Sequence, residues 1–294
     1  MPRRGDISDE TVLGLYFGRG LNRRQTAEAL GCSQDLVSYR LKKLGMKPKS
    51  MSECVISGNR RSVPMSRECL ERLDGEMLGD GHINLGVGGS GSFRESFGHD
   101  KRMWAEWLMG FWMDQGVPVG SGIHVKKPSG KSPNPSFGFS TKETVELGNV
   151  HRRWYVRNNN FDPKMVRTFS NRKFIKTVPA DIVLTARALL HWYIGDGTSQ
   201  KHGGCMFYTG GFKVQECEYL RLRLLKDLGI RSTMKDGTNI YVPRADWMRM
   251  LEIAGECPVQ CYAYKWEYSM TMPKPRNMDT SIDMNLVDVF LRGR

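Results

Sequence analysis

Apolar and polar residues alternate along the chain in two periods, one typical of amphipathic helices and one typical of half-buried strands. Over the first 45 residues, apolar positions recur at helical spacing in three short segments, and each segment follows a Ser or Asn that can cap a helix. The turn GCS at 31–33 separates the second segment from the third. Two short helices joined by a tight turn are typical of a helix-turn-helix. Residues 1–45 are therefore predicted to form a small all-helical DNA-binding domain.

In a helix-turn-helix the last helix enters a major groove and presents side chains to bases and phosphates. A three-helix bundle with a solvated basic face is the alternative interpretation. Residues 46–65 lack periodicity and combine Pro, Ser and Gly with basic residues, so they are predicted to be a linker that follows the DNA backbone. The DNA contacts predicted for the domain and the linker are Gln34, Ser38, Tyr39, Arg40, Lys42, Lys43, Arg60 and Arg61.

From residue 66 onward the chain repeats one pattern, a helix followed by two strands, a second helix, two more strands and a third helix. Each copy opens with an apolar helix that ends in Gly-Asp-Gly, and the two aspartates, Asp80 and Asp196, lie 116 positions apart. The sequence thus predicts an α+β fold in which two αββαββα halves form a pseudo-dimer within one chain. The first half is assigned to 66–178 and the second to 179–275, followed by a tail of no clear role at 276–294.

The two helices that end in Gly-Asp-Gly are predicted to pack against each other. Gly75 and Gly79 lie four positions apart on one side of the first helix, which allows another helix to approach closely. Packing along their lengths would bring Asp80 and Asp196 together at the helix ends. Two adjacent carboxylates repel each other, and a hard cation with oxygen ligands, such as Mg²⁺, removes that repulsion. The predicted chemistry is metal-assisted phosphodiester hydrolysis.

The net charge of +13 indicates a polyanionic partner, although solubility alone is the alternative explanation. The excess of basic residues is concentrated in 1–62 and 124–176, as expected for binding nucleic acid. Strand alternation turns Ile123 and Val125 toward the core and leaves polar neighbours facing outward. The DNA contacts predicted for the repeated halves are His82, Asn84, Arg94, Ser96, His124, Lys126, Lys127, Lys173, Lys201, Lys235, Asn239 and Tyr241.

The composition also bounds the location of the protein. With 39% apolar and 26% charged residues the chain is predicted to fold. No apolar run approaches the roughly 20 residues that a membrane helix needs, and the N-terminus does not read as a secretory signal. Seven cysteines, an odd number scattered over the chain, do not form a disulfide pattern. We expect a reducing, cytoplasmic location and no membrane partner; the sequence does not decide between a bacterial, a phage and an organellar host.

The segments LDGEMLGDG at 73–81 and LLHWYIGDG at 189–197 resemble two degenerate copies of the LAGLIDADG motif of homing endonucleases, in the single-chain form. The resemblance covers 66 to about 270. It implies two saddle-shaped antiparallel sheets that follow the major groove and two central motif helices whose acids cut both strands. Asp74, Glu76 and Leu78 depart from the residue types that the family prefers at those positions. His191 and Trp192 are bulky where small residues would pack best, which suggests an asymmetric helix interface.

Site residues follow from the resemblance, position by position. It implies that two or three Mg²⁺ ions bind at paired sites made by Asp80, Asp196 and the carbonyls of Gly79 and Gly195. It also implies catalytic lysines, which match Lys176 in KTVP and Lys265 in YAYK.

The activity implied by the resemblance is site-specific double-strand DNA cleavage that leaves short 3′ overhangs. The enzyme would serve a mobile intron or a free-standing element and act as a monomer on a long asymmetric target. A group I intron RNA maturase is an alternative, because charge does not distinguish RNA from DNA. A transcriptional regulator with inactive acids is another, although the retention of Asp80 and Asp196 argues against it.

Overall fold

The computed structural model describes residues 7–18, 21–46, 62–86, 88–120, 122–126, 134–165, 172–201 and 203–271. The predicted linker contacts Arg60 and Arg61, the predicted contact Lys127 and the tail at 276–294 lie outside these residues. None of the helices within the described ranges is long and apolar enough to cross a membrane.

The N-terminal unit contains the three predicted helices around a small core of its own. They are α1 (Asp9–Leu13), continued by the π-helix η1 (Gly14–Gly18), then α2 (Arg23–Leu30) and α3 (Gln34–Lys43). Ser8, Asn22 and Ser33 each accept a hydrogen bond from a backbone N–H of the first helical turn, as the sequence predicted. The core of the unit is formed by Ile7, Val12, Tyr16, Ala27, Leu36, Val37 and Leu41.

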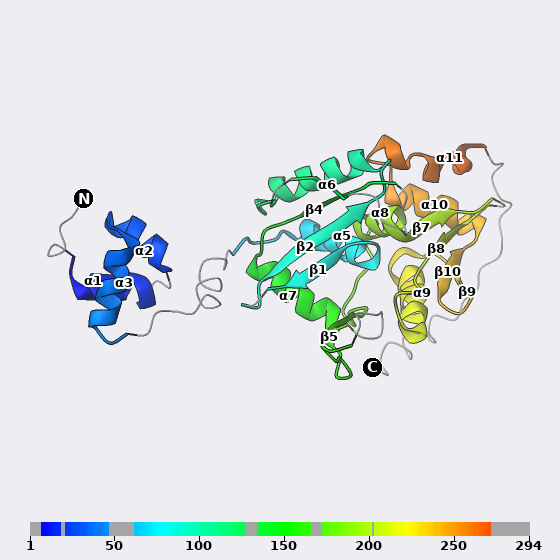
Figure 1. The fold of residues 1–294 in the computed structure, drawn as a ribbon. Helices are drawn as coiled ribbons and strands as arrows, with labels where there is room; N and C mark the ends of the chain where they lie inside the picture. Colours follow the sequence, from blue (N-terminus) through cyan, green and yellow to red (C-terminus); the bar gives the residue numbers. More distant parts are fainter. Residues whose placement is uncertain are drawn as a thin grey trace.

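The two predicted halves are present and have the same topology (Figure 1). The first comprises α5 (Arg67–Leu78), β1 (His82–Leu85), β2 (Gly91–Phe97), α6 (Arg102–Asp114), β3 (His124–Lys126), β4 (Ser136–Ser140) and α7 (Val145–Trp154). The second comprises α8 (Ala186–Asp196), β7 (Gly197–Ser199), β8 (Cys205–Phe207), α9 (Val214–Leu228), β9 (Thr233–Lys235), β10 (Asn239–Val242) and α10 (Arg244–Ala254). The strand orders are β1-β2-β4-β3 and β7-β8-β10-β9, and every pairing is antiparallel. The tandem αββαββα prediction is confirmed.

In each half the αββαββα unit is followed by an element that the sequence pattern did not predict. After α7, strands β5 (Tyr155–Arg157) and β6 (Phe174–Lys176) form a separate antiparallel pair. The third helix of the first half therefore ends at Trp154, whose side chain is buried, and the next residue, Tyr155, begins β5. After α10 come the 3-10 helix η2 (Gln260–Tyr262) and the helix α11 (Tyr264–Thr271).

The motif helices α5 and α8 pack against each other at glycines. A Cβ atom on Gly75 would clash with the backbone carbonyl of Ala188 and lie 2.7 Å from the Cβ of His191. A Cβ atom on Gly195 would lie 3.1 Å from the Cα of Gly79. The predicted close approach is confirmed, and it depends on the missing side chains.

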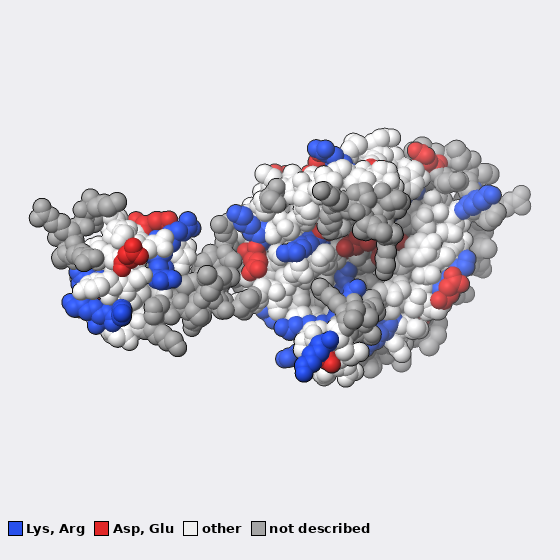
Figure 2. All heavy atoms as spheres, in the orientation of Figure 1, with Lys and Arg blue, Asp and Glu red and all other residues white. Residues whose placement is uncertain are grey.

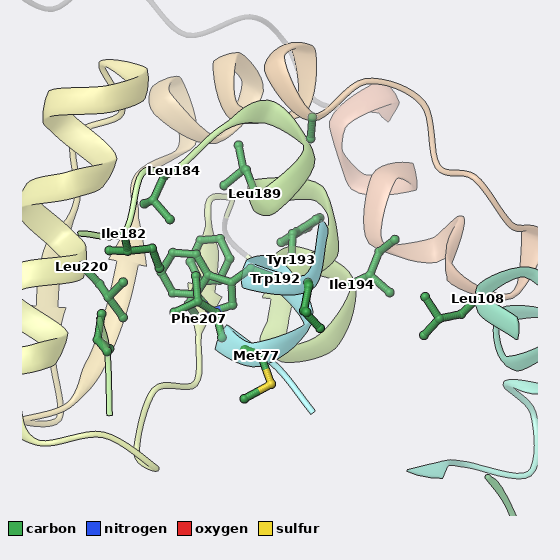
Figure 3. Close-up of a cluster of buried hydrophobic side chains, with 14 of the residues drawn as sticks. Met77, Leu108, Ile182, Leu184, Leu189, Trp192, Tyr193, Ile194, Phe207 and Leu220 are labelled. Carbon is green, nitrogen blue, oxygen red and sulfur yellow. The ribbon is translucent and has the colours of Figure 1, made fainter. Parts of the chain in front are cut away.

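A single hydrophobic core joins the two halves (Figure 3). Met77 of α5 lies beside Trp192 and Tyr193 of α8, and the Trp192 ring stacks on Phe207 of β8 at 4.2 Å. These side chains are almost completely removed from solvent, and each such burial stabilises the fold by about 1.5–3 kcal/mol. The halves are therefore held as one body, which fixes the ends of the motif helices relative to each other.

Three of the residues that depart from the family motif make paired polar contacts, Glu76 with His191 across the helix interface and Asp74 within the first half. Glu76 forms a hydrogen bond with Nδ1 of His191, and both side chains are buried. The carboxylate of Asp74 accepts hydrogen bonds from Arg153 at 2.5 Å and from the Trp154 indole at 2.9 Å. His191 fits because it lies opposite Gly75, so the predicted asymmetry of the interface is observed.

Candidate active site

The structure brings the two predicted acids to adjoining helix ends. Asp80 follows Gly79, which ends α5, and Asp196 is the last residue of α8. A Cβ atom on Gly195 would lie 3.3 Å from the backbone nitrogen of Asp80, so the two chain segments are in direct contact. The C-terminal ends of helices carry partial negative charge, which adds to that of the carboxylates.

Both carboxyl groups hold their protons more tightly than ordinary aspartates. Burial, followed by the charge of Asp80, raises the pKa of Asp196 to about 7, against the opposing effect of Lys176 and Lys265. The pKa of Asp80 is also raised, mainly because protein atoms displace water from around its carboxyl group. Such a pair is stabilised by a divalent cation, which replaces the missing solvation and cancels the repulsion.

Two lysines bind the ends of the motif helices. The ammonium group of Lys176, on β6, donates to the carbonyls of Gly79 at 3.1 Å and Gly81 at 2.8 Å. Lys265, on α11, donates to three carbonyls at the end of α8, those of Tyr193 (3.0 Å), Ile194 (2.6 Å) and Gly197 (2.6 Å). The carbonyls of Gly81 and Gly197 occupy equivalent places in the two motifs, so each half supplies one lysine to its own motif helix.

Burial lowers the pKa of both lysines to about 8, while Asp196 and Asp80 favour the charged forms. At neutral pH the ammonium forms predominate. The two positions differ in access, because Lys176 is half-buried and Lys265 is only 4% exposed.

A cavity of about 900 Å³ opens beside the first acid. Its lining is polar and basic and includes Asp80, His82, Asn84, Tyr155, Arg172, Lys173 and Lys176. Figure 2 shows acidic side chains inside a hollow of this face and Lys and Arg along its lower rim, where Figure 1 places β5. This arrangement suits a phosphate group, because the basic side chains at the rim can neutralise its charge while the acidic side chains hold a cation.

The donor set at the helix ends fits Mg²⁺. Among the residues described, no cluster of three or more His, Cys, Asp or Glu side chains forms a metal cage. The two aspartates and nearby backbone carbonyls are oxygen donors, and Mg²⁺ is usually bound by one or two carboxylates together with water and phosphate oxygens. The predicted ligand Gly79 uses its carbonyl oxygen to accept a bond from Lys176.

The first sheet places its predicted DNA contacts on one face. His82 pairs with Arg94, and Ser96 and His124 flank Gly138 on adjoining strands. By the same alternation Asn84 shares this face, whereas the opposite face contributes Phe93, Phe97 and Phe139 to the core. The side chain of the predicted contact Lys126 lies outside the part of the chain that the structure describes. The prediction that the side chain of Val125 faces the core is wrong. This residue is 62% exposed because β3 is the outermost strand and lies at the margin of the core.

The second sheet repeats the arrangement with fewer charges. Ile240 and Val242 are buried, so Asn239 and Tyr241 lie on the opposite face, as predicted. Lys235 pairs with Asn239, and its ammonium group lies 5.8 Å from the Tyr241 ring. Outside the sheet, Lys201 lies exposed in the turn after β7, and Lys173 is exposed just before β6.

In the N-terminal unit most predicted contacts lie at the surface. Gln34, Tyr39, Lys42 and Lys43 are exposed on α3, and Ser38 is half-buried. Arg40 differs, because its guanidinium group forms an ion pair with Asp9 at 2.7 Å and its side chain is only 14% exposed. Arg40 thus holds α3 against α1 instead of facing outward.

Sequence reasoning missed two features of the site. Glu95 lies on the core face of β2, is buried and shares a hydrogen bond with Glu76. Burial, followed by the charge of Glu76, raises the pKa of Glu95 well above its ordinary value, so a shared proton can hold the pair together. Arg172, which lines the cavity, was the second omission. Two signals in the sequence could have revealed them. Glu95 is an acid at a position where the strand pattern calls for an apolar residue, and Arg172 belongs to a run of basic residues.

Comparison with known proteins places the chain in a family. The sequence profile of the LAGLIDADG DNA endonuclease family matches residues 70–250, which is more than half of the chain. The protein belongs to this family. The match includes both Gly-Asp-Gly segments, as the resemblance of the motifs predicted.

Individual relatives of this LAGLIDADG protein are distant. The "Uncharacterized protein MJ1098" of Methanocaldococcus jannaschii is 24% identical over 75% of this chain and 80% of its own length. The "Cytochrome b mRNA maturase bI2" of Saccharomyces cerevisiae is 25% identical over 70% of this chain, which spans about half (49%) of the maturase.

Among solved structures, the homing endonuclease I-WcaI bound to its DNA recognition sequence has the same fold. Its TM-score is 0.54 at 19% identity, and the match covers 76% of this chain and 96% of I-WcaI. The comparison confirms the predicted LAGLIDADG architecture.

Proposed function

We propose that this LAGLIDADG protein is a site-specific, Mg²⁺-dependent double-strand DNA endonuclease. The observation that carries the proposal is the meeting of Asp80 and Asp196 at two adjoining helix ends, each accompanied by a lysine from its own half. Membership of a DNA endonuclease family and a fold shared with DNA-bound I-WcaI support it.

The residues at the helix ends divide the chemistry between them. The carboxylates of Asp80 and Asp196, with the carbonyls of Gly79 and Gly195, would hold two or three Mg²⁺ ions. Bound Mg²⁺ supplies Lewis-acid stabilisation of phosphate oxygens and lowers the pKa of water. The lysine ammonium groups place positive charge where the transition state gains negative charge. Two such sites cut the two strands of one duplex and leave short 3′ overhangs.

Recognition is assigned to the outer faces of the two sheets and to the N-terminal unit. His82, Asn84 and Arg94 lie next to the first motif, while Asn239 and Tyr241 provide the equivalent face in the second half. Side chains of these types pair with base edges in the major groove, and Lys173, Lys201 and Lys235 suit phosphates. The exposed side chains of α3 extend the contact. One monomer thereby recognises a long asymmetric target.

The test is cleavage of a plasmid library that carries randomised target sequences, incubated with the purified protein and Mg²⁺ and followed by sequencing of the new ends. We expect a narrow set of related sites cut with short 3′ overhangs, and no cutting when EDTA replaces Mg²⁺. Absence of any cut population under conditions where the protein binds DNA would refute the proposal.

Cleavage should depend on pH with a narrow maximum. Mg²⁺ requires deprotonated carboxylates, and the pKa of Asp196 is about 7, so the single-turnover rate should rise as pH increases toward 7. The lysines, whose pKa values are about 8, lose their charge above that pH, and the rate should fall again. Higher Mg²⁺ should move only the acidic limb, to lower pH, because metal and proton compete. A rate that increases steadily up to pH 10 would contradict this assignment.

RNA maturation is a second candidate, favoured by the yeast maturase among the relatives. A group I intron RNA would then bind the protein and splice faster in its presence. The discriminating measurement compares binding of this chain to a structured intron RNA and to the DNA target selected by cleavage. Specific intron binding together with failure to cut the intron-insertion site would favour the maturase.

A further inference from the structure

The β5–β6 pair breaks the repeat of the two halves. In the first half, residues 155–175 separate α7 from the active-site lysine Lys176; we call the described residues 155–165 and 172–176 the β5–β6 arm. In the second half the corresponding connection is residues 255–263, all of which the structure describes, and it contains only η2 before the helix that carries Lys265. An extra element therefore lies at one candidate active site and is replaced by a short turn at the other.

The arm is firmly attached to the first half. The hydroxyl group of Tyr155 accepts a hydrogen bond from the backbone N–H of Ile83 at 3.3 Å, which ties β5 to β1. His151 of α7 stacks on the Tyr155 ring with centroids 4.4 Å apart. Beyond the strands, Asn158 bonds to the carbonyls of both Arg172 and Lys173, at 2.9 Å each. The described base of the arm is thus a fixed surface, and its pairing of Tyr155 with Lys176 positions the lysine at the end of α5.

The arm presents cations beside the first acid. Arg172 and Lys173 are exposed and line the same cavity as Asp80 and Lys176. Arg157 is exposed and lies two residues from Tyr155, on the same face of the strand pair. The one acid in the described part of the arm, Asp162, accepts a hydrogen bond from the backbone N–H of Lys164. This surface is therefore strongly positive where the cavity opens to solvent.

A DNA strand cut at Asp80 must continue past this surface. The phosphates on either side of the scissile group follow the same backbone, and the cavity leads from Asp80 directly to Arg172 and Lys173. Arginine and lysine at fixed positions neutralise phosphates and hold a backbone in register. We propose that the β5–β6 arm is a phosphate clamp for the strand cut at Asp80, which the described connection 255–263 of the second half lacks, so that the enzyme holds the two strands unequally. The inference rests on the endonuclease function proposed above.

The test uses full-length protein and the duplex selected from the plasmid library, with a different fluorophore on each strand. The variant combines Arg157→Gln, Arg172→Gln and Lys173→Gln. The control combines Arg102→Gln, Lys226→Gln and Arg249→Gln, which remove the same charge from the surface of helices α6, α9 and α10. A Lys176→Met variant identifies the strand cut at the first site, as the one whose cleavage it slows more. Thermal unfolding of each variant establishes that the fold is retained.

We expect the arm variant to slow single-turnover cleavage of the strand marked by Lys176→Met about tenfold more than cleavage of the other strand. The slope of log affinity against log salt, measured with Ca²⁺ in place of Mg²⁺, should decrease by about 0.9 for each phosphate that the arm no longer neutralises. The control should leave the ratio of the two strand rates at the wild-type value. Equal slowing of both strands, or an unchanged ratio, would overturn the clamp while leaving the endonuclease intact. A wild-type protein that cuts no DNA would overturn both.

Discussion

Replacing Asp80 and Asp196 together with Asn is expected to reduce DNA cleavage by at least about 10³-fold, because loss of the metal ligands removes several kcal/mol of transition-state stabilisation. Asparagine keeps the shape of each side chain, so binding of the target duplex in Ca²⁺ should fall much less than the cleavage rate. The measurement is single-turnover cleavage of the library-selected duplex at saturating protein. Cleavage that survives in this double variant would remove the paired acids from the mechanism.

Replacing Asp196 alone with Asn should make the metal-free protein more stable. The pKa of Asp196 is about 7 in the folded state against an ordinary value of 3.8, so between these pH values the folded state binds more protons than the unfolded state. Stability contributed by this group therefore decreases as pH rises through that window, and the penalty is complete above pH 7. Without Mg²⁺ at pH 8, Asp196→Asn should raise the Tm. The exposed Glu256→Gln, in the connection after α10, is the control and should leave the Tm unchanged.

Gly75→Ala is expected to destabilise the two-half body by roughly 1–3 kcal/mol, the usual effect of overpacking a close contact. The added methyl group would meet the Ala188 carbonyl and the His191 Cβ on the facing helix, and neither backbone can move without disturbing the other motif. The measurement is urea unfolding followed by tryptophan fluorescence. All seven tryptophans lie between 104 and 266, so the signal reports only on this body and not on the N-terminal unit.

Gly110→Ala provides the control in the same fold. Gly110 lies inside α6, and a Cβ atom there would meet nothing within 4 Å. Alanine in a helix interior is favoured over glycine by about 0.5–1 kcal/mol, so this variant should be slightly more stable than the wild type. If Gly75→Ala and Gly110→Ala changed the free energy of unfolding equally, close packing of α5 against α8 would not explain why residue 75 is a glycine.

Much of the fold could be predicted because its signals are local. The N-caps Ser8, Asn22 and Ser33 were correct, since a cap depends on a side chain and the N–H groups two or three residues later. Strand faces were correct for β2 and β10, where alternation meets a continuous core. The prediction failed for Val125, because an edge strand alternates in the same way whether or not a core lies beneath its last residues.

In the candidate site, too, some features follow from the sequence and others only from the tertiary structure. The sequence alone determined the duplicated halves, the two Gly-Asp-Gly helix ends and the excess of positive charge, because each of these depends on residue type and on spacing along the chain. Only the tertiary structure decided that Arg40 faces Asp9, that Glu76 pairs with His191 and Glu95, and that one half carries the β5–β6 arm. These contacts join residues far apart in the chain, and a local sequence pattern does not indicate which distant residue will pair with a buried charge.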